Sequence, residues 1–417
     1  MRFIADFHLH SRYSRATSSD MVVETIDRWA RLKGIKVLST GDFTHPGYFA
    51  ELKSKLQSSG NGLFSLKGDD GYASFILTTE VSNIFHQGGK LRKIHTLIFA
   101  PSFELVEALN RQLDELGKLE VDGRPTFSFP VRELVRMIAD ISDQFLIVPA
   151  HAWTPWFSLF GANSGFDSME ECFGDELKHI YAIETGLSSD PQMNWRLSAL
   201  DGVCLISNSD AHSPSKIGRE ANVFDISLDY FEIINAIKEQ DRDRFLHTIE
   251  FFPQEGKYHY DGHRNCDVLC SPAESLSQQN RCPVCGRRLT VGVMHRVETL
   301  ADRPEGYQPP HAIPARHMVP LAEIIAESLN QGVNTRAVDA EYHRLVEHFG
   351  SEFRILLDLP QEELVTFAPP KIVEGIMRMR QGRLNIRPGY DGVFGKISIF
   401  SAEEKEEAPP AEQIDLF

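Results

Sequence analysis

Histidines and carboxylates recur in this sequence directly after short apolar runs, in FHLH, LSTGDFTH, FILTTE, FLIVPAH and VCLISNSDAH. The residues that these runs deliver are His8, His10, Asp42, His45, Glu80, His151, Asp210 and His212. Imidazole combined with carboxylate suits Zn²⁺, Mn²⁺ or Fe²⁺ better than Mg²⁺ alone. The set exceeds the needs of one ion, so we expect two or three divalent metals, with Zn²⁺, Mn²⁺ and Mg²⁺ as the candidates.

A cluster of several metal ions indicates one class of reaction. Such centres activate water and neutralise both the attacking and the leaving oxygen when a phosphate ester is cleaved. We therefore expect hydrolysis of a phosphate ester, with Asp210, His8 and Glu80 as catalytic residues. Any single member of the set also fits a solvated loop or a structural role. Core packing, however, does not explain why five separate runs each end in a ligand type.

The pattern leaves four other residues open. His95 begins its apolar run in KIHTLIFA, so it is equally compatible with a metal ligand and with a structural residue. Glu184, at the end of YAIE, fits a ligand or a side chain that braces the pocket. Asp20 is a weaker candidate because it lies further from its motif. In RFIADFHLH, strand alternation places Asp6 on the same face as the two histidines, where it would orient them.

These residues need a scaffold that brings distant parts of the chain together, and the apolar pattern predicts one. Short apolar runs alternate with amphipathic stretches such as VVETIDRWARLK, which is typical of strands linked by helices. The strand candidates are residues 3–10, 35–40, 75–80, 95–99, 145–150, 181–184 and 203–207. Seven units suit a parallel α/β barrel, in which the carboxyl ends of the strands meet at one mouth. We expect this catalytic barrel to span residues 1–250.

A second group of metal-binding residues follows the barrel. A C-x3-C pair and a C-x2-C pair are separated by eleven residues. The four residues are Cys266, Cys270, Cys282 and Cys285. Four thiolates in two close pairs are typical of a closed, structural Zn²⁺ site, with a redox pair as the alternative. We expect a small four-cysteine zinc module over residues 251–300, in which Arg287 and Arg288 contact DNA phosphates, as Arg296 also could.

The remaining chain divides into a helical region and a tail. Helical periodicity returns in LAEIIAESL and AEYHRLVEHF, and between Lys371 and Lys396 six basic residues face two carboxylates. We expect a helical, partly basic DNA-binding domain at residues 301–397 and a disordered acidic tail at residues 398–417. The net charge of −16 argues against a generally nucleic-acid-coating surface, so any DNA contact would use local basic patches.

Two further features concern location and substrate contact. Apolar runs long enough to cross a membrane are absent from the sequence, and MRFIADFHLH lacks the pattern of a signal peptide. We expect a cytoplasmic, nucleoid-associated protein without a membrane partner. After His151, the segment AWTPWFSLFG offers Trp153 and Trp156 as surfaces on which DNA bases could stack. Packing in the core or in a lid is the alternative for these aromatic residues.

The motifs HLH, GDFTHP, TTE, PAH and SDAH together resemble the polymerase-and-histidinol-phosphatase (PHP) superfamily. The resemblance covers residues 1–245 and implies a distorted seven-stranded barrel that binds a metal cluster. Two departures concern the third metal and the second motif. YSRATSSD puts Arg15 near the position where many members carry a third ligand, and Asp42 and His45 are spaced where many members have adjacent Asp and His.

Beyond the barrel, GKYHYDGHRNC, the cysteine cluster and the helical region resemble the endonuclease Q family over nearly the whole chain. This resemblance implies a metal-dependent DNA repair endonuclease that acts on double- or single-stranded DNA. The expected cleavage lies 5′ of deaminated bases (uracil, hypoxanthine, xanthine) and of abasic sites, and leaves a 3′-hydroxyl and a 5′-phosphate. The resemblance also implies that the catalytic metals are held by His8, His10, His45, Glu80, His151, Asp210 and His212.

The last five residues, QIDLF, place three large apolar side chains after the acidic run EEKEEAPPAE. The pentapeptide resembles the bacterial sliding-clamp-binding motif of the QLxLF type. It implies that a clamp groove captures Gln413, Ile414, Leu416 and Phe417 while the flexible tether lets the barrel search nearby DNA.

Three other functions compete with a lesion endonuclease. A proofreading 3′–5′ exonuclease of the same superfamily would also cleave phosphodiesters and travel with clamps. A small-molecule phosphatase would use the same barrel but leaves the zinc module and the tail without a purpose. A non-catalytic adaptor would need no such set of ligands at the ends of strands.

Overall fold

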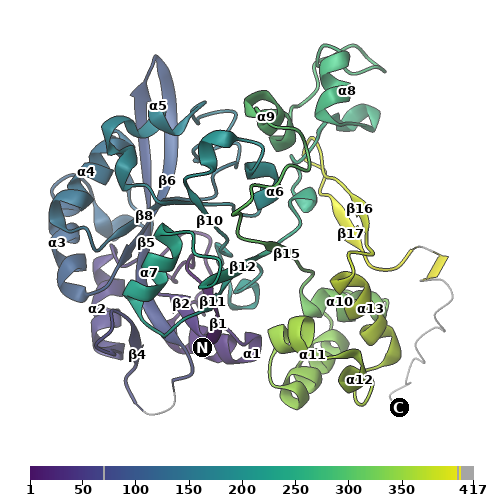
Figure 1. Ribbon diagram of the computed structural model, residues 1–417, viewed down its shortest axis with the longest axis horizontal. Coiled ribbons are helices and arrows are strands. Elements are labelled where there is room, and N and C mark those ends of the chain that lie inside the picture. The colour runs from purple at the N-terminus through teal and green to yellow at the C-terminus, as the bar shows by residue number, and fades with distance from the viewer. Residues whose placement is uncertain (69–70, 402, 405–417) are drawn as a thin grey trace.

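The computed structural model describes residues 1–68, 71–401 and 403–404, and a mixed β-sheet forms the centre of its largest part (Figure 1). The strands of this part are β1 (Arg2–Asp6), β2 (Val37–Ser39), β3 (Leu56–Ser58), β4 (Phe64–Leu66), β5 (Ser74–Gln87), β6 (Lys90–Ala100), β7 (Thr126–Phe127), β8 (Leu146–Pro149), β9 (Ala182–Glu184), β10 (Cys204–Ile206), β11 (Ala221–Asp225) and β12 (Phe245–Glu250). The path from β11 through β1, β2 and β5 continues by way of β6 to β8. β9 and β10 form a separate parallel pair, and a bridge between Leu9 and Ala211 links the segments that follow β1 and β10.

The strands do not all run parallel. β1, β2 and β5 are parallel neighbours, whereas β5 with β6, β6 with β8, and β1 with β11 are antiparallel. Gly88 and Gly89 reverse the chain between β5 and β6 with φ of 62° and 74°, and two left-handed residues in succession match the twist of a hairpin. The expected parallel sheet is therefore correct for the first strands and wrong where hairpins replace crossover helices. Closure into a seven-unit barrel stays a prediction.

Amphipathic helices cover this sheet. Their bounds are α1 (Val23–Lys33), α2 (Pro46–Lys55), α3 (Phe103–Asp114), α4 (Val131–Ile141), α5 (Met169–Phe173), α6 (Pro191–Asn194) and α7 (Tyr230–Lys238). In α4 the buried residues are Val131, Leu134, Val135 and Ile138, which share one helical face. A second buried cluster includes Phe7, directly before His8 in the chain, and Phe99, and their rings meet at 5.5 Å between centroids.

The rest of the chain forms a small module and a group of helices (Figure 1, upper and lower right). The bounds are β13 (Asp261–His263), β14 (Val268–Cys270), α8 (Pro272–Ser277), α9 (Val293–Leu300), β15 (Ala315–His317), α10 (Leu321–Ser328), α11 (Arg336–Phe349), α12 (Gln361–Leu364), α13 (Pro370–Arg380), β16 (Asn385–Arg387) and β17 (Lys396–Ser398). Two contacts cross the boundaries expected from the sequence. β15 joins the main sheet beside β12, and the loop between β16 and β17 returns to the module, where Asp391 accepts hydrogen bonds from Arg264 N and Thr290 Oγ1.

A buried ion pair fixes the C-terminal helices against the main part. Lys33 Nζ, at the end of α1, lies 2.7 Å from Glu352 Oε2, and Tyr342 donates a hydrogen bond to the same carboxylate oxygen at 2.8 Å. At Gly34, φ is 85° and an added Cβ would lie 2.5 Å from Ser351 Oγ, so glycine is required for this close approach.

Within the described ranges, no helix is long and apolar enough to cross a membrane. The residues expected to bind a sliding clamp, Gln413, Ile414, Leu416 and Phe417, lie outside the described residues.

Candidate metal centre and zinc module

Two adjoining groups of side chains lie where β1, β8 and β10 end, beside the middle of β5 and β6. In each group, the possible ligand atoms lie within 4.8 Å of one another. The first group is His8, His10 and Asp210, and the second is Glu80, His95 and His151. All six residues belong to the set expected from the sequence, and His95, which the sequence left open, lies in the second group.

The atoms of the first group have the character of metal ligands. Nε2 of His8, Nε2 of His10 and Oδ1 of Asp210 are buried and make no well-aligned hydrogen bond among the described residues, although His10 Nε2 lies 3.2 Å from Asp210 Oδ1. Leaving such groups unpaired costs free energy unless something else binds them. Two imidazole nitrogens and one carboxylate oxygen form a donor set that suits a transition-metal ion, so these residues fit the divalent metal that the sequence predicts.

Glu80 belongs to both groups by position. Its Oε1 lies 2.8 Å from His95 Nδ1 and 3.0 Å from His151 Nε2, while its Oε2 lies 3.3 Å from His10 Nε2. The carboxylate is fully buried, and although burial opposes ionisation, neighbouring groups that include the charged Arg124 hold the pKa of Glu80 well below its ordinary value. Burial also lowers the pKa of His95 to about 4, which keeps this imidazole in the neutral form that metals bind.

Two carboxylates orient the histidines of the first group. Glu184 Oε1 lies 3.0 Å from His8 Nδ1, and Asp42 Oδ1 lies 3.0 Å from His10 Nδ1. Glu184 therefore orients His8, which agrees with the second of the two roles that the sequence allows, a side chain that braces the pocket. The expectation that Asp42 is a ligand is not supported, because its other oxygen accepts hydrogen bonds from Ser11 N, Ser11 Oγ and Ser14 Oγ at 2.6 to 2.9 Å.

His45, expected as a ligand, lies outside both groups. It is the N-cap residue of α2, where its Nδ1 accepts a hydrogen bond from Tyr48 N at 3.3 Å and its Nε2 lies 3.2 Å from Glu120 O. Helix α2 begins at Pro46, directly after His45, and the imidazole of His45 caps the N-terminus of this helix. His212 stays close, with its ring 4.5 Å from that of His10, but Nδ1 is 2.9 Å from the backbone oxygen of Asp210 and the residue is in neither group.

Asp6 and Asp20 also take other roles. β1 ends at Asp6, so the two histidines follow the strand rather than extend it. The Asp6 carboxylate accepts hydrogen bonds from Ser209 N at 3.1 Å and Gly218 N at 2.9 Å, and thereby ties the loop after β10 to β1. Asp20 is exposed and is in neither group.

Several site residues have left-handed backbone conformations. The φ angles are 47° at Asp42, 31° at His151 and 47° at Asp210. Non-glycine residues adopt this region infrequently, with Asp, Asn and His among the more tolerant types. Gly186 allows the turn at His151, because an added Cβ would lie 2.5 Å from His151 Cβ. The loops that carry the ligands are therefore held in conformations that the surrounding contacts impose.

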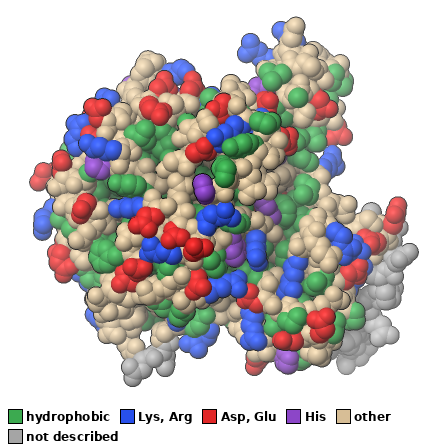
Figure 2. Space-filling model, viewed as in Figure 1, with side chains coloured by type: hydrophobic (Ala, Val, Ile, Leu, Met, Phe, Trp, Pro, Cys, Tyr) green, Lys and Arg blue, Asp and Glu red, His purple; other side chains and the backbone are tan. Residues whose placement is uncertain are grey.

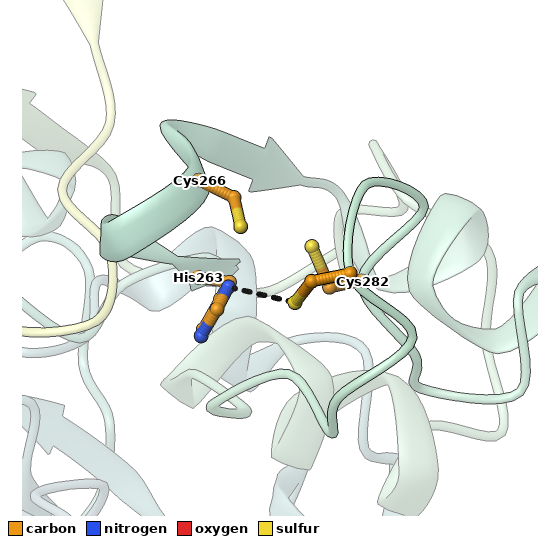
Figure 3. A group of neighbouring side chains, drawn as sticks. His263, Cys266 and Cys282 are labelled. Carbon is orange, nitrogen blue, oxygen red and sulfur yellow. Dashed lines mark hydrogen bonds between the residues drawn. The ribbon is translucent and has the colours of Figure 1, made fainter.

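The cysteine-rich module contains a third group, and it differs from the expected one. His263, Cys266, Cys282 and Cys285 lie together, and Figure 3 shows the first three side chains directed toward a common centre. Cys285 Sγ is 3.5 Å from His263 Nδ1. One histidine and three thiols fit a closed zinc site, and although burial opposes it, the N–H groups of Cys285 and Val284 lower the pKa of Cys282 to about 7.

The sequence predicts Cys270 as the fourth ligand, whereas the structure groups His263 with the other three cysteines. Cys270 ends β14 opposite Asp261, two residues along β13 from His263, and its thiol is buried against Leu289 and Cys282. The signal that points to His263 is its spacing from Cys266, H-x2-C, which matches the C-x2-C of the second pair.

The predicted DNA-contacting residues separate into exposed and structural ones. Trp156 is 51% exposed, and Lys93 Nζ lies 4.9 Å from its ring centre. Trp153 is buried, donates a hydrogen bond to Asn194 Oδ1 and packs on Phe160, so the prediction that it contacts DNA is wrong. The residues of the zinc module with exposed guanidinium groups include Arg287 and Arg288, whereas Arg296 bonds the carbonyl oxygens of residues 160 and 166.

The chain is similar to known proteins over most of its length. The family described as the MJ0043 C-terminal domain matches residues 320–383. The YqxK protein of Bacillus subtilis (strain 168) is 29% identical over 95% of this chain and 99% of its own length. The crystal structure of the lesion-specific endonuclease PfuEndoQ from Pyrococcus furiosus is 32% identical, with 98% of each chain covered and a TM-score of 0.85. A complex of endonuclease Q with a 27-mer duplex substrate that has an abasic lesion at the active site is also 32% identical, covering 99% of this chain and 100% of that chain, with a TM-score of 0.84.

Proposed function

The chain belongs to the endonuclease Q family, and from this premise we propose that it is a DNA repair endonuclease that hydrolyses the phosphodiester on the 5′ side of a damaged nucleotide. The observation that carries the proposal is the pair of adjoining groups that could hold metal ions, in which Glu80 of the second group also lies 3.3 Å from His10 of the first. The substrates are DNA with uracil, hypoxanthine, xanthine or an abasic site, and the products carry a 3′-hydroxyl and a 5′-phosphate.

The residues of the centre divide the work of binding and orientation. His8, His10 and Asp210 would hold one divalent ion, and His95 and His151 with Glu80 would hold a second. Zn²⁺, Mn²⁺ or Mg²⁺ bound there would supply charge stabilisation to the phosphate oxygens and lower the pKa of water. Asp42 and Glu184 hold the imidazoles of the first group with Nδ1 protonated and Nε2 free, because each carboxylate lies against Nδ1.

Basic and aromatic surfaces around the centre provide the DNA contacts. Arg287 and Arg288 are exposed on the zinc module and would bind backbone phosphates, and Trp156 would stack on a base. Figure 2 shows Lys and Arg side chains gathered where the main part meets the C-terminal helices. A cavity of about 430 Å³ at this junction is lined by Lys216, Arg219 and Arg336 among others. These patches are local, in keeping with the acidic net charge.

The test is cleavage of end-labelled duplexes in the presence of Mn²⁺, Mg²⁺ or Zn²⁺. One duplex is undamaged, and the others carry a single uracil, hypoxanthine or abasic site. We expect one nick 5′ of the lesion, absent with Asp210→Ala. Degradation from the 3′ end of every duplex would establish the exonuclease instead, and turnover of a small phosphomonoester without any nick would establish the phosphatase.

We also propose that the C-terminal pentapeptide binds a bacterial sliding clamp, on the strength of its sequence. The experiment is surface plasmon resonance with immobilised clamp. The full chain should bind, while a variant with Leu416→Ala and Phe417→Ala should not, and both should nick a short lesion duplex equally. Equal binding by the two chains would show that the clamp contact lies elsewhere in the chain. Binding by neither chain would show that there is no clamp contact.

A further inference from the structure

Arg124 extends from the loop between residue 121 and β7 to the edge of the metal centre. We propose that its guanidinium group binds a non-bridging oxygen of the phosphodiester that is cleaved. This inference rests on the proposed function, because it assigns a contact to the substrate of that same centre.

The loop that carries Arg124 is held from both sides. Gly123 N donates a hydrogen bond to Tyr13 O at 3.0 Å, and Ser82 N donates one to Pro125 O at 2.9 Å. Arg124 N is bound by Asp122 Oδ1 at 3.1 Å. At Gly123 an added Cβ would lie 2.5 Å from the Asp42 carboxylate, so only glycine lets the loop approach the group that orients His10. The position of Arg124 beside the centre is therefore built into the backbone.

The guanidinium group is anchored at one point and is otherwise free to bind. Nη1 donates a hydrogen bond to Glu80 Oε2 at 2.9 Å, and Glu80 is fully buried while the Arg124 side chain is 28% exposed. Arginine has five N–H donors in a rigid planar fork. In the part of the chain that the structure describes, the bond to Glu80 is the one hydrogen bond of this side chain, so the remaining donors can receive a ligand at the mouth of the centre.

The chemistry of a phosphodiester fits this arrangement. Its non-bridging oxygens carry one negative charge, and a guanidinium fork binds such oxygens with two parallel hydrogen bonds. Negative charge on these oxygens increases as the attacking oxygen approaches, so a donor that is already oriented stabilises the transition state more than the ground state. Glu80 orients the guanidinium before the substrate arrives. Arg124 is thus placed as a catalytic residue rather than as a surface charge.

A second role for the same geometry is purely structural, with Arg124 acting only to hold Glu80 in place. The two roles differ in what a substitution changes. Loss of an anchor for Glu80 would reduce the metal content of the chain, and an added small cation would not restore the rate. Loss of a phosphate contact would leave the metal content unchanged, and free guanidinium ion could occupy the vacated position.

The experiment compares Arg124→Ala and Arg124→Lys with Arg15→Ala in the full chain, using single-turnover nicking of a lesion duplex with Mn²⁺. Arg15 is the matched control, because it binds the same loop through Asp122 Oδ2 at 3.2 Å but its side chain is 76% exposed. We expect Arg124→Ala to lower the rate constant by about 10²- to 10³-fold at unchanged metal content, Arg124→Lys to keep part of the rate, and Arg15→Ala to match the wild type. Guanidinium chloride should increase the nicking rate constant of Arg124→Ala but not that of the wild type, Arg124→Lys or Arg15→Ala.

A wild-type rate for Arg124→Ala, or a loss of rate that follows metal content and resists guanidinium, would overturn the inference. Failure of the wild-type chain to nick any lesion duplex would instead count against the proposed function. In that case, inorganic phosphate serves as the probe: the Mn²⁺-loaded wild type should bind it more tightly than Arg124→Ala, and equal affinity would again overturn the inference.

Discussion

Asp42 Oδ1 lies 3.0 Å from Nδ1 of His10, and this contact determines which nitrogen of the imidazole is available for a metal. A carboxylate at Nδ1 holds the proton there and leaves the lone pair of Nε2 free. Nε2 of His10 is buried and makes no well-aligned hydrogen bond among the described residues. Asp42, which the sequence predicts as a ligand, therefore lies where it would position His10.

Asp42→Asn should weaken the binding of the divalent metal by about 10- to 100-fold. The amide is uncharged, and it can accept the Nδ1–H hydrogen bond of His10 only through its oxygen and not through its NH₂ group. Isothermal titration of the metal-free chain with Mn²⁺ measures this, and high Mn²⁺ should recover most of the nicking rate. Asp20→Asn is the control, since Asp20 is exposed and lies outside both groups. Equal affinity in both variants would show that Asp42 does not position His10.

Cys270→Ser should retain the zinc of the module, whereas Cys282→Ser and His263→Ala should lose it. The reason is that Cys270 packs against Cys282 but is not one of the four grouped side chains. Replacement of the zinc by Co²⁺ gives a direct reading, because the intensity of the sulfur-to-cobalt absorption reports the number of thiolates. The expected intensity corresponds to three thiolates in both the wild type and Cys270→Ser. Loss of intensity in Cys270→Ser, with His263→Ala unaffected, would support the four-cysteine site.

Trp156→Ala and Trp153→Ala should separate DNA binding from stability. Trp156 is exposed, so its removal should change the free energy of unfolding little and weaken binding to a lesion duplex by about 1–3 kcal/mol. Trp153 is buried, and its truncation should lower the free energy of unfolding by about 3–5 kcal/mol. Fluorescence anisotropy of labelled duplex and urea unfolding provide the two measurements. Unchanged DNA affinity in Trp156→Ala would remove it from the DNA interface.

Glu250 should make stability fall as pH rises toward neutrality. Burial raises the pKa of this carboxyl from 4.5 to about 7, so between these values the folded chain keeps a proton that the unfolded chain releases. Its contribution to stability is therefore complete below pH 4.5 and is lost as pH rises through 7. Glu250→Gln stays neutral, so the loss of unfolding free energy between pH 5 and 8 should be smaller than in the wild type, by up to about 3 kcal/mol.

Urea unfolding at several pH values checks this, with exposed Glu133→Gln as the control. Parallel pH profiles for the wild type and Glu250→Gln would contradict the buried, protonated carboxyl.

The sequence was most informative where chemistry coincides with the end of an apolar run. His8, His151 and Asp210 could be found in this way because they follow β1, β8 and β10, whereas Glu80 lies in the middle of β5, which is longer than its apolar run. The local structure of the loops was not predictable to the same degree. The spacing of Asp42 and His45 does not reveal that a helix begins at Pro46 and takes up the imidazole.

The pairing of distant segments was also hidden. Arg124 has no motif around it, and its role depends on contacts of the neighbouring residues with Tyr13 and Ser82, which lie far away in the chain. In the zinc module, the C-x3-C spacing predicts Cys270 as a ligand, whereas the hairpin of β13 and β14 brings His263 beside the other three cysteines. In both cases tertiary contacts, not local spacing, determine which side chains meet.

The position of Glu80 between the two groups has a thermodynamic consequence. Oε2 of Glu80 faces His10 of the first group and Oε1 faces His95 of the second, so if both groups held an ion, the affinity of each site would depend on the occupancy of the other. Linkage requires this dependence to be reciprocal: whatever the first ion does to the affinity of the second, the second does equally to the first. The two sites would therefore respond to metal concentration as one coupled unit, and a substitution in either group would change the metal affinity of both.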